Sequence, residues 1–160
     1  MKAAIKLDAR ELAVAFAKAG VGKPADAKKP DRYTLYACLM TAAVAEGHSA
    51  AAVQLARDGA AYDSTNNAGK RATEYGLRAA AVLLKSGDAT AAASEFESLI
   101  ARTPEDGNLY VKAAEAMLGA KQGQRAVAFA EQGLAKAKEF GSRDLEGACR
   151  ELLNAAKRYK

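Results

Sequence analysis

Residues 73–106 read TEYGLRAAAVLLKSGDATAAASEFESLIARTPED, and the next 34 residues repeat their pattern of small and apolar positions. Ala80 recurs at this step as Ala114 and again as Ala148. A repeat of this length holds two helices and one turn. The chain is therefore predicted to be an array of copies of a single helical hairpin.

The composition favours helices along the whole chain. Half of the 160 residues are hydrophobic, yet only 6% are aromatic, and alanine supplies much of the apolar content. Alanine has the strongest helix propensity, and its small side chain lets helices cross closely. Only three prolines occur. We predict an all-α fold in which Ala80, Ala92, Ala114 and Ala126 are buried at helix crossings.

Caps and apolar spacing define the expected helices. The clearest start is Thr103-Pro104-Glu105-Asp106, which combines a threonine cap, a proline in the first turn and two acidic groups. The run Asp63-Ser64-Thr65-Asn66-Asn67 is predicted to be a turn. The expected helices are at about residues 8–20, 32–46, 50–62, 68–85, 89–102, 104–119, 124–139 and 143–158.

The net charge of +5 is unevenly spread. Residues 1–32 hold eight basic and four acidic side chains, whereas residues 73–106 hold three basic and six acidic ones. A protein that binds nucleic acid more often shows one continuous basic stripe. The charge pattern therefore argues against a nucleic-acid partner.

Residues that carry chemistry are few. Cys38 and Cys149 are far apart in the sequence, and together with the single histidine, His48, they are too few for a zinc site. Glu95 and Glu97 point in different directions on a helix, so they make a poor catalytic pair. We predict that the chain is not an enzyme and needs no metal or cofactor.

The sequence also contains no membrane signal. No apolar run approaches the roughly 20 residues that a bilayer-spanning helix needs. The first residues, Met1 to Lys6, have no apolar segment of the length found in signal peptides. These features predict a cytoplasmic protein without membrane insertion.

The repeated unit resembles the tetratricopeptide repeat. That family has a small residue in the first helix, a Gly-acidic turn, an alanine and then an aromatic residue in the second helix, and a proline where the next unit begins. In residues 73–106 these features stand at Ala80, Gly87-Asp88, Ala92, Phe96 and Pro104.

The neighbouring units match this pattern less completely. In residues 107–140, Lys121 replaces the turn glycine and Ala130 replaces the aromatic residue. Residues 33–62 are a weaker copy, and an insertion lengthens the step to the next unit to 40 residues.

The resemblance implies an all-α, right-handed α-solenoid in one domain. It implies about three helical hairpins with a capping helix at each end. The expected hairpins cover residues 32–62, 68–102 and 104–139, and the capping helices cover residues 8–20 and 143–158.

In this family the first helix of each hairpin lines a concave groove that takes part of a partner protein. The residues that the resemblance places in this groove are Thr34, Ala37, Thr41, Glu74, Leu77, Arg78, Lys85, Asn108, Lys112 and Glu115. The cations Arg78, Lys85 and Lys112 are suited to acidic groups of a partner. Members that bind chaperone tails use a lysine and asparagines here, and Ala37 and Thr41 at the matching places argue against that clamp.

The expected function is therefore a non-enzymatic scaffold or adaptor that binds a protein or peptide partner. The alternative is an RNA-binding helical-repeat protein, which reads bases with one or two side chains per unit. The identity of the partner and the oligomeric state are left open by the sequence.

Overall fold

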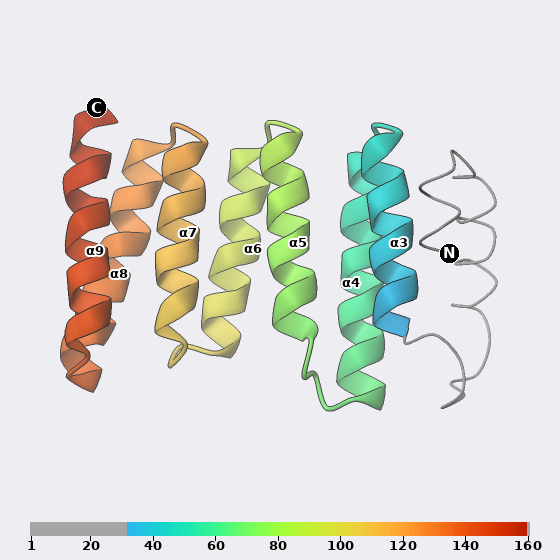
Figure 1. The fold of residues 1–160 in the computed structure, drawn as a ribbon, viewed down its shortest axis with the longest axis horizontal. Coiled ribbons are helices and arrows are strands. Elements are labelled where there is room, and N and C mark those ends of the chain that lie inside the picture. The colour runs from blue at the N-terminus through green and yellow to red at the C-terminus, as the bar shows by residue number, and fades with distance from the viewer. Residues whose placement is uncertain (1–31, 160) are drawn as a thin grey trace. The chain divides into compact units, whose positions relative to one another are not determined.

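The computed structural model describes residues 32–159 and is helical through most of this range (Figure 1). The helices are α3 (Arg32–Ala45), α4 (Ser49–Asn66), α5 (Ala72–Lys85), α6 (Ala89–Arg102), α7 (Gly107–Gly119), α8 (Gly123–Phe140) and α9 (Arg143–Ala156), followed by the short 3₁₀ helix η1 (Lys157–Tyr159). No strand occurs between residues 32 and 159, so the prediction of an all-α fold is confirmed. The helix expected at residues 8–20 lies outside the described residues.

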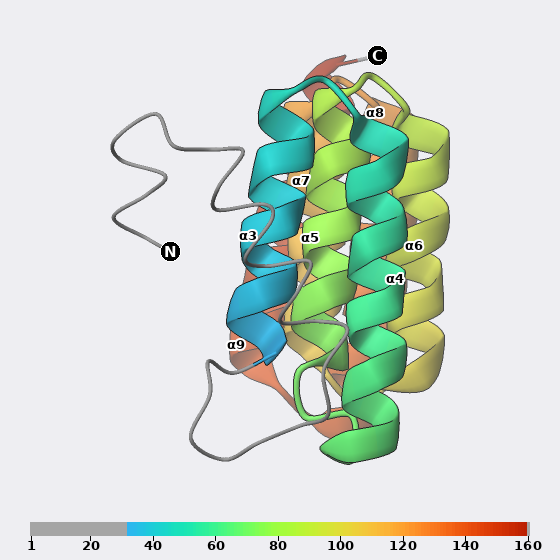
Figure 2. The same cartoon turned by 90° about the vertical axis from the view of Figure 1, so that its right-hand side faces the viewer.

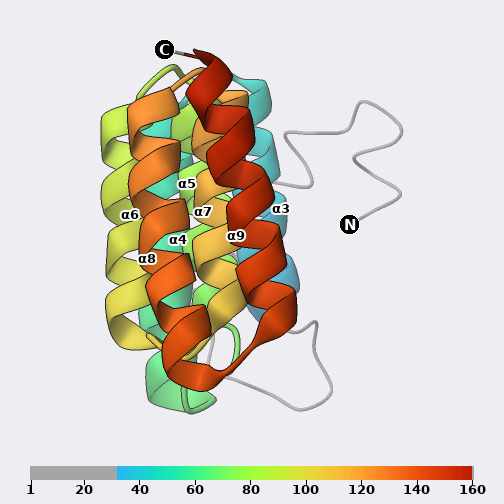
Figure 3. The same cartoon turned by 90° about the vertical axis from the view of Figure 1, so that its left-hand side faces the viewer.

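The helices belong to two compact units, which lie within residues 1–82 and 83–160. In the first unit, α3 and α4 pack side by side in opposite directions (Figure 2). In the second unit, α8 packs against both α7 and α9 (Figure 3), and α7 also contacts α6 and α9. The order is that of successive antiparallel helices, as in a tetratricopeptide-like array. The single domain and the handedness of the solenoid remain predictions.

One turn geometry recurs between helices. In each such turn a residue in the left-handed backbone region follows the end of one helix. The backbone N–H of the residue after it donates to the carbonyl of the residue five positions before the donor. The left-handed residues are Gly47 (φ 79°), Gly87 (φ 85°), Lys121 (φ 58°) and Gly141 (φ 66°). The four N–H to O distances, from His48, Asp88, Gln122 and Ser142, are 2.8, 2.9, 2.8 and 2.9 Å. This hydrogen bonding satisfies carbonyls that the helix end leaves unpaired.

Lys121 lies where glycine stands in the three matching turns, so its side chain strains the backbone. The left-handed conformation costs a non-glycine residue about 1–2 kcal/mol. Glycine avoids this cost, but part of the gain is lost because glycine makes the unfolded chain more flexible and so stabilises it. Lys121→Gly is expected to raise the free energy of unfolding by about 0.5–1 kcal/mol, measured by urea denaturation.

The matched control for Lys121→Gly is Gln124→Gly. Gln124 is exposed and lies in the first turn of α8. Glycine there is expected to lower stability by about 0.5–1 kcal/mol. A loss of stability in both variants would contradict the role assigned to the left-handed position.

The predicted turn at residues 63–67 is wrong, because α4 continues to Asn66. The side chains of Ser64, Thr65 and Asn66 each donate to the carbonyl four residues earlier, at 2.9, 3.1 and 2.9 Å. Side chains that bond backward in this way remain compatible with the helix instead of ending it. The result is an 18-residue α4, against 14 residues in α6.

The next helix, α5, begins at Ala72 rather than at residue 68. Ala68 and Gly69 have positive φ values of 52° and 72°, which a right-handed helix cannot include. The longer α4 and this loop together account for the 40-residue step between the first two units.

Asp63 holds the loop between α4 and α5. Its side chain is buried, and the two carboxylate oxygens accept from the Asn67 amide at 2.8 Å and from the Arg71 backbone N–H at 2.7 Å. Its backbone carbonyl accepts from the N–H of Asn67 at 2.8 Å and of Gly69 at 3.1 Å. The chain reversal before α5 is therefore organised by one residue.

Asp63→Ala removes both carboxylate acceptors and leaves their donors unpaired. We expect the free energy of unfolding to fall by about 1–3 kcal/mol in urea or thermal denaturation. Asp58→Ala is the matched control, because Asp58 is exposed on the same helix and, within residues 32–159, its carboxylate accepts from Gln54 alone, at 2.8 Å. Its effect is expected to stay within about 0.5 kcal/mol. Equal losses in the two variants would disprove the bridging role of Asp63.

The expected start of the helix at residue 104 is also wrong. Thr103 does not cap α7, because its hydroxyl donates to the Leu99 carbonyl at 3.1 Å and so belongs to the end of α6. Asp106 is the actual cap, and its carboxylate accepts from the Asn108 N–H at 3.0 Å. The helix α7 therefore begins at Gly107.

The small residues of the repeat are buried as predicted. Ala80, Ala92 and Ala114 are fully buried and Ala126 is 1% exposed. In the second unit the ring of Phe96 meets that of Phe129 edge to face, with centroids 6.2 Å apart. Phe129 thus supplies the aromatic ring of its unit one residue before Ala130, the position that the repeat spacing indicated.

Candidate partner-binding surface

We use "first-helix face" for the ten residues that the sequence placed in the groove, which lie on α3, α5 and α7. Their spacing of three, four or seven residues puts them on one side of each helix. On α3, Thr34 and Ala37 are half-buried and Thr41 is exposed. The Thr41 hydroxyl donates to the Ala37 carbonyl at 2.8 Å, so this stripe offers short side chains that are bonded to their own helix.

On α5 the same face is mixed. Glu74 and Lys85 are exposed, whereas Leu77 and Arg78 are half-buried. Glu74, Leu77 and Arg78 belong to the first unit, and Lys85 belongs to the second. Arg78 differs from Lys85 in having a half-buried rather than an exposed side chain.

On α7 the first-helix face consists of Asn108, Lys112 and Glu115, which are all exposed. The other side of α7 is buried, and it carries Leu109, Tyr110, Ala113, Ala114 and Met117. One side of this helix is therefore committed to the core, and the other carries three polar groups.

A cluster on the first unit, formed by Tyr33, Arg71 and Arg78, was not predicted from the sequence. One guanidinium nitrogen of Arg78 donates to the Tyr33 hydroxyl at 2.9 Å. The guanidinium carbons of Arg71 and Arg78 lie 4.4 and 5.1 Å from the centre of the Tyr33 ring. We call these three residues the Tyr33 cluster.

Surrounding groups fix the Tyr33 ring. It meets the buried ring of Tyr75 edge to face, with centroids 5.3 Å apart. Burial raises the pKa of the Tyr33 hydroxyl, and its hydrogen bond to Glu74 acts in the same direction, while Arg78 opposes both. The hydroxyl therefore stays protonated at neutral pH.

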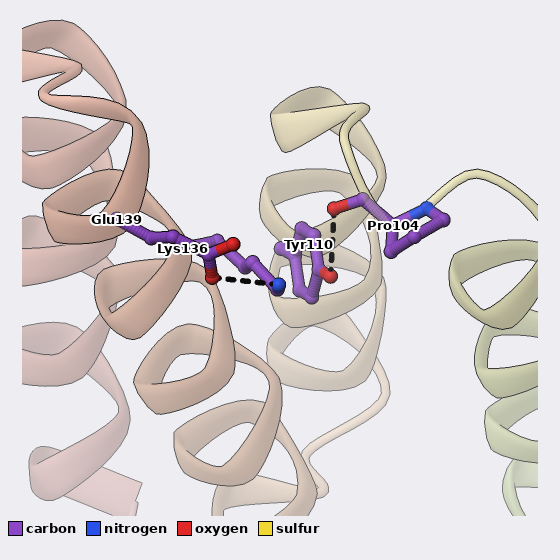
Figure 4. Close-up of polar contacts among 4 residues, drawn as sticks. All are labelled: Pro104, Tyr110, Lys136 and Glu139. Carbon is purple, nitrogen blue, oxygen red and sulfur yellow. Dashed lines mark hydrogen bonds and ion pairs between the residues drawn. The ribbon is translucent and has the colours of Figure 1, made fainter.

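The polar contacts of Tyr110 in the second unit are structural (Figure 4). The Tyr110 hydroxyl donates to the Pro104 carbonyl at 3.0 Å and ties the start of α7 to the turn before it. Nearby on α8, the Lys136 ammonium bonds to the Glu139 carboxylate at 2.7 Å, and this bond raises the pKa of Lys136. Tyr110 as a whole is 2% exposed, in agreement with a packing role.

Groups that could perform chemistry lie apart from one another. Burial raises the pKa of the Cys149 thiol, which disfavours the reactive thiolate. His48 is exposed in its turn, 3.6 Å from the Glu46 carboxylate. Within the described part of the chain, no three histidine, cysteine or acidic side chains gather as a metal site would require. None of the helices between residues 32 and 159 is long and apolar enough to cross a membrane.

The geometry agrees with the comparison to known families. A family model described as tetratricopeptide repeat matches residues 83–143. Residues 83–143 are thus similar to the tetratricopeptide repeat family. The matched segment runs from the last residues of α5 through α6, α7 and α8 to the start of α9. No curated protein and no solved structure matched the chain.

Tetratricopeptide repeats generally serve as protein–protein interaction modules and are typically non-catalytic. Each repeat buries its apolar sides against its neighbours and leaves the outer side of its helices to solvent. The exposed stripe of Asn108, Lys112 and Glu115 on α7 lies within the matched segment and is a solvent-facing side of this kind.

Proposed function

We propose that the chain is a non-enzymatic scaffold or adaptor, which binds a segment of a partner protein along the first-helix face. The observation that carries this proposal is the division of α7 into a buried apolar side and an exposed stripe of Asn108, Lys112 and Glu115. A stripe on a well-packed helix presents its groups in a fixed arrangement. Binding to it therefore costs little ordering of the backbone.

The make-up of the face supports a protein rather than a nucleic-acid partner. It combines short side chains on α3 with both acidic and basic groups on α5 and α7. Exposed glutamates at positions 74 and 115 would repel phosphate groups, whose contacts dominate binding to RNA. A protein segment can instead meet such a face with matching apolar, acidic and basic groups.

The test compares two glutamates on opposite helices of one repeat. The whole chain is immobilised to capture a partner from a lysate of the source organism, and the affinity of the purified partner is then measured. Glu115→Arg on α7 changes the first-helix face, and Glu131→Arg on α8 makes the same charge change at another exposed position. Thr41→Arg on α3 and Gln54→Arg on α4 form the corresponding pair in the first unit.

We expect the two first-helix variants to weaken binding by about tenfold or more, because a bulky cation is placed inside the interface. The two second-helix variants are expected to bind within about twofold of the unmodified chain, as surface positions outside an interface do. Loss of binding only in the α4 and α8 variants would contradict the assignment. Capture of RNA with a steep salt dependence would replace it by the RNA-binding alternative.

A further inference from the structure

Two chain segments bring four cationic side chains to one end of the second unit. Lys121 lies in the turn between α7 and α8, Arg125 lies in the first turn of α8, and Lys157 and Arg158 lie in η1. The short helix η1 contacts both α9 and α8. The start of α8 and the end of α9 lie at the same end of this unit (Figure 3). We call these four residues the basic edge.

A close approach between α8 and α9 shows that cations from the two segments are level with each other. A Cβ atom at Gly133 would lie 2.7 Å from the Cys149 sulfur, so these two residues face each other on antiparallel helices. Lys157 follows Cys149 by eight residues, and Arg125 precedes Gly133 by eight residues. Because each residue adds about 1.5 Å along a helix, Lys157 and Arg125 reach the same level of the unit.

The charges of the basic edge are not neutralised by nearby acidic groups. Three of the four side chains are exposed, and that of Arg125 is half-buried. The guanidinium of Arg125 donates to the side-chain oxygens of Gln122 and Thr90, at 3.0 and 2.9 Å, and both acceptors are neutral. Lys85 and Asp88, in the turn that leads to Thr90, add one charge of each sign. Among residues 32–159, no carboxylate oxygen lies within ion-pair distance of the basic edge.

The opposite end of the second unit has the opposite charge balance. The segments that form it, residues 102–108 and 138–146, hold three basic and five acidic side chains. Residues 119–125 and 157–159, at the basic edge, hold four basic and no acidic ones. Charge is therefore separated along the helix axes. A negatively charged surface attracts the basic edge and repels the other end, so the unit is oriented as it approaches.

The form of the edge favours a membrane surface over other polyanions. Clusters of four or more lysine and arginine side chains are typical of proteins that bind anionic lipid headgroups, and cations at one level can meet a plane together. The neutral residues between Lys121 and Arg125 are glycine and glutamine. They offer no large apolar group for insertion into the acyl chains and no aromatic ring on which a base could stack.

We propose that the basic edge docks the second unit on a membrane surface rich in anionic phospholipids, with the helix axes pointing away from the membrane. The contact is electrostatic and lies at the headgroups, so no part of the chain needs to cross the bilayer. The inference goes beyond the proposed function, because it uses side chains outside the first-helix face. A unit held in this way leaves the exposed stripe of α7 open to a partner protein.

The test measures binding of the whole chain to vesicles that are collected by sedimentation. One set consists of phosphatidylcholine alone, and in the other about one-third of the lipid is phosphatidylserine. We expect the anionic vesicles to bind the chain at least about tenfold more tightly at low salt, and the difference to shrink at physiological salt, because salt screens exposed charges. Equal binding to the two sets at low salt would overturn the proposal.

Two double variants with the same net charge locate the contact. Lys121→Glu with Lys157→Glu changes the basic edge, and Arg102→Glu with Lys138→Glu makes the same charge change at two exposed positions of the opposite end. We expect the first pair to weaken binding to anionic vesicles by about tenfold or more. The control pair is expected to weaken it by less than about threefold, because its charges lie farther from the lipid than the screening length.

Each other outcome counts against the basic edge. Comparable losses in the two double variants would show that only net charge matters. Unchanged binding of the first pair would show that another part of the chain meets the lipid. Circular dichroism and urea midpoints check each fold, and the milder pair Lys121→Gln with Lys157→Gln, with an expected loss of about fivefold, tests the contact if the reversed charges unfold the chain.

An RNA oligonucleotide serves as the competing polyanion. Vesicle binding that persists at physiological salt in the presence of this RNA is the expected result. If the RNA binds more tightly than the anionic vesicles and depends on Lys121 and Lys157, the basic edge is a nucleic-acid contact and the membrane proposal is wrong.

Discussion

Met117→Ala is expected to lower the free energy of unfolding by about 2–5 kcal/mol, the range for truncating a large buried side chain. Met117 is fully buried on α7, the helix of the second unit that contacts α6, α8 and α9. The substitution removes buried apolar surface and leaves a cavity that three packed helices cannot close freely. Urea denaturation followed by circular dichroism measures the change.

Leu118→Ala is the control for this prediction, since Leu118 is the next residue of the same helix and is only half-buried. Its truncation is expected to cost less than half as much as that of Met117, in proportion to the smaller area it removes from solvent. A larger loss for Leu118 than for Met117 would mean that α7 turns a different side to the core.

Gly133→Ala is expected to lower stability by about 1–3 kcal/mol, although alanine is the better helix former by about 1 kcal/mol. A Cβ atom at Gly133 would lie 2.7 Å from the Cys149 sulfur and 2.9 Å from the Tyr110 Cβ. Both neighbours are themselves buried, so neither can move away easily. The clash on three packed helices therefore outweighs the gain in propensity.

Gly147→Ala is the matched control, because Gly147 also lies inside a helix but has open space where the new Cβ would stand. There the propensity term acts alone, and we expect stability to rise by about 0.5–1 kcal/mol. Opposite signs for the two glycines are the expected result of thermal denaturation. A gain in both variants would show that α8 does not approach α7 and α9 as closely as described.

The repeated hairpin could be predicted because its signals are local and periodic. Ala80 and Ala114 are 34 residues apart in the sequence, and both are buried in the structure. Gly87 marks a turn with a positive φ, and Lys121 has a positive φ at the matching position of the next unit. Local signals were misread where a polar side chain had two possible partners. Thr103 and the residues after Asp63 bond backward to their own helix, a choice that composition does not reveal.

The candidate site divides in the same way. Helical spacing was enough to place Asn108, Lys112 and Glu115 on one exposed stripe. The Tyr33 cluster depends on a contact between residues 45 positions apart, which no local pattern encodes. The one available signal was the seven-residue spacing of Arg71 and Arg78, which puts both on one side of α5 and the turn before it.

The most direct test of the central claim, that a partner protein binds the first-helix face, is a map of backbone amide shifts by NMR. The ¹⁵N-labelled chain is titrated with the partner captured as described above. Our account predicts that the shifted amides concentrate on α3, α5 and α7, around Thr41, Arg78 and Glu115. Shifts confined to α4, α6 and α8, with α3, α5 and α7 unchanged, would contradict it.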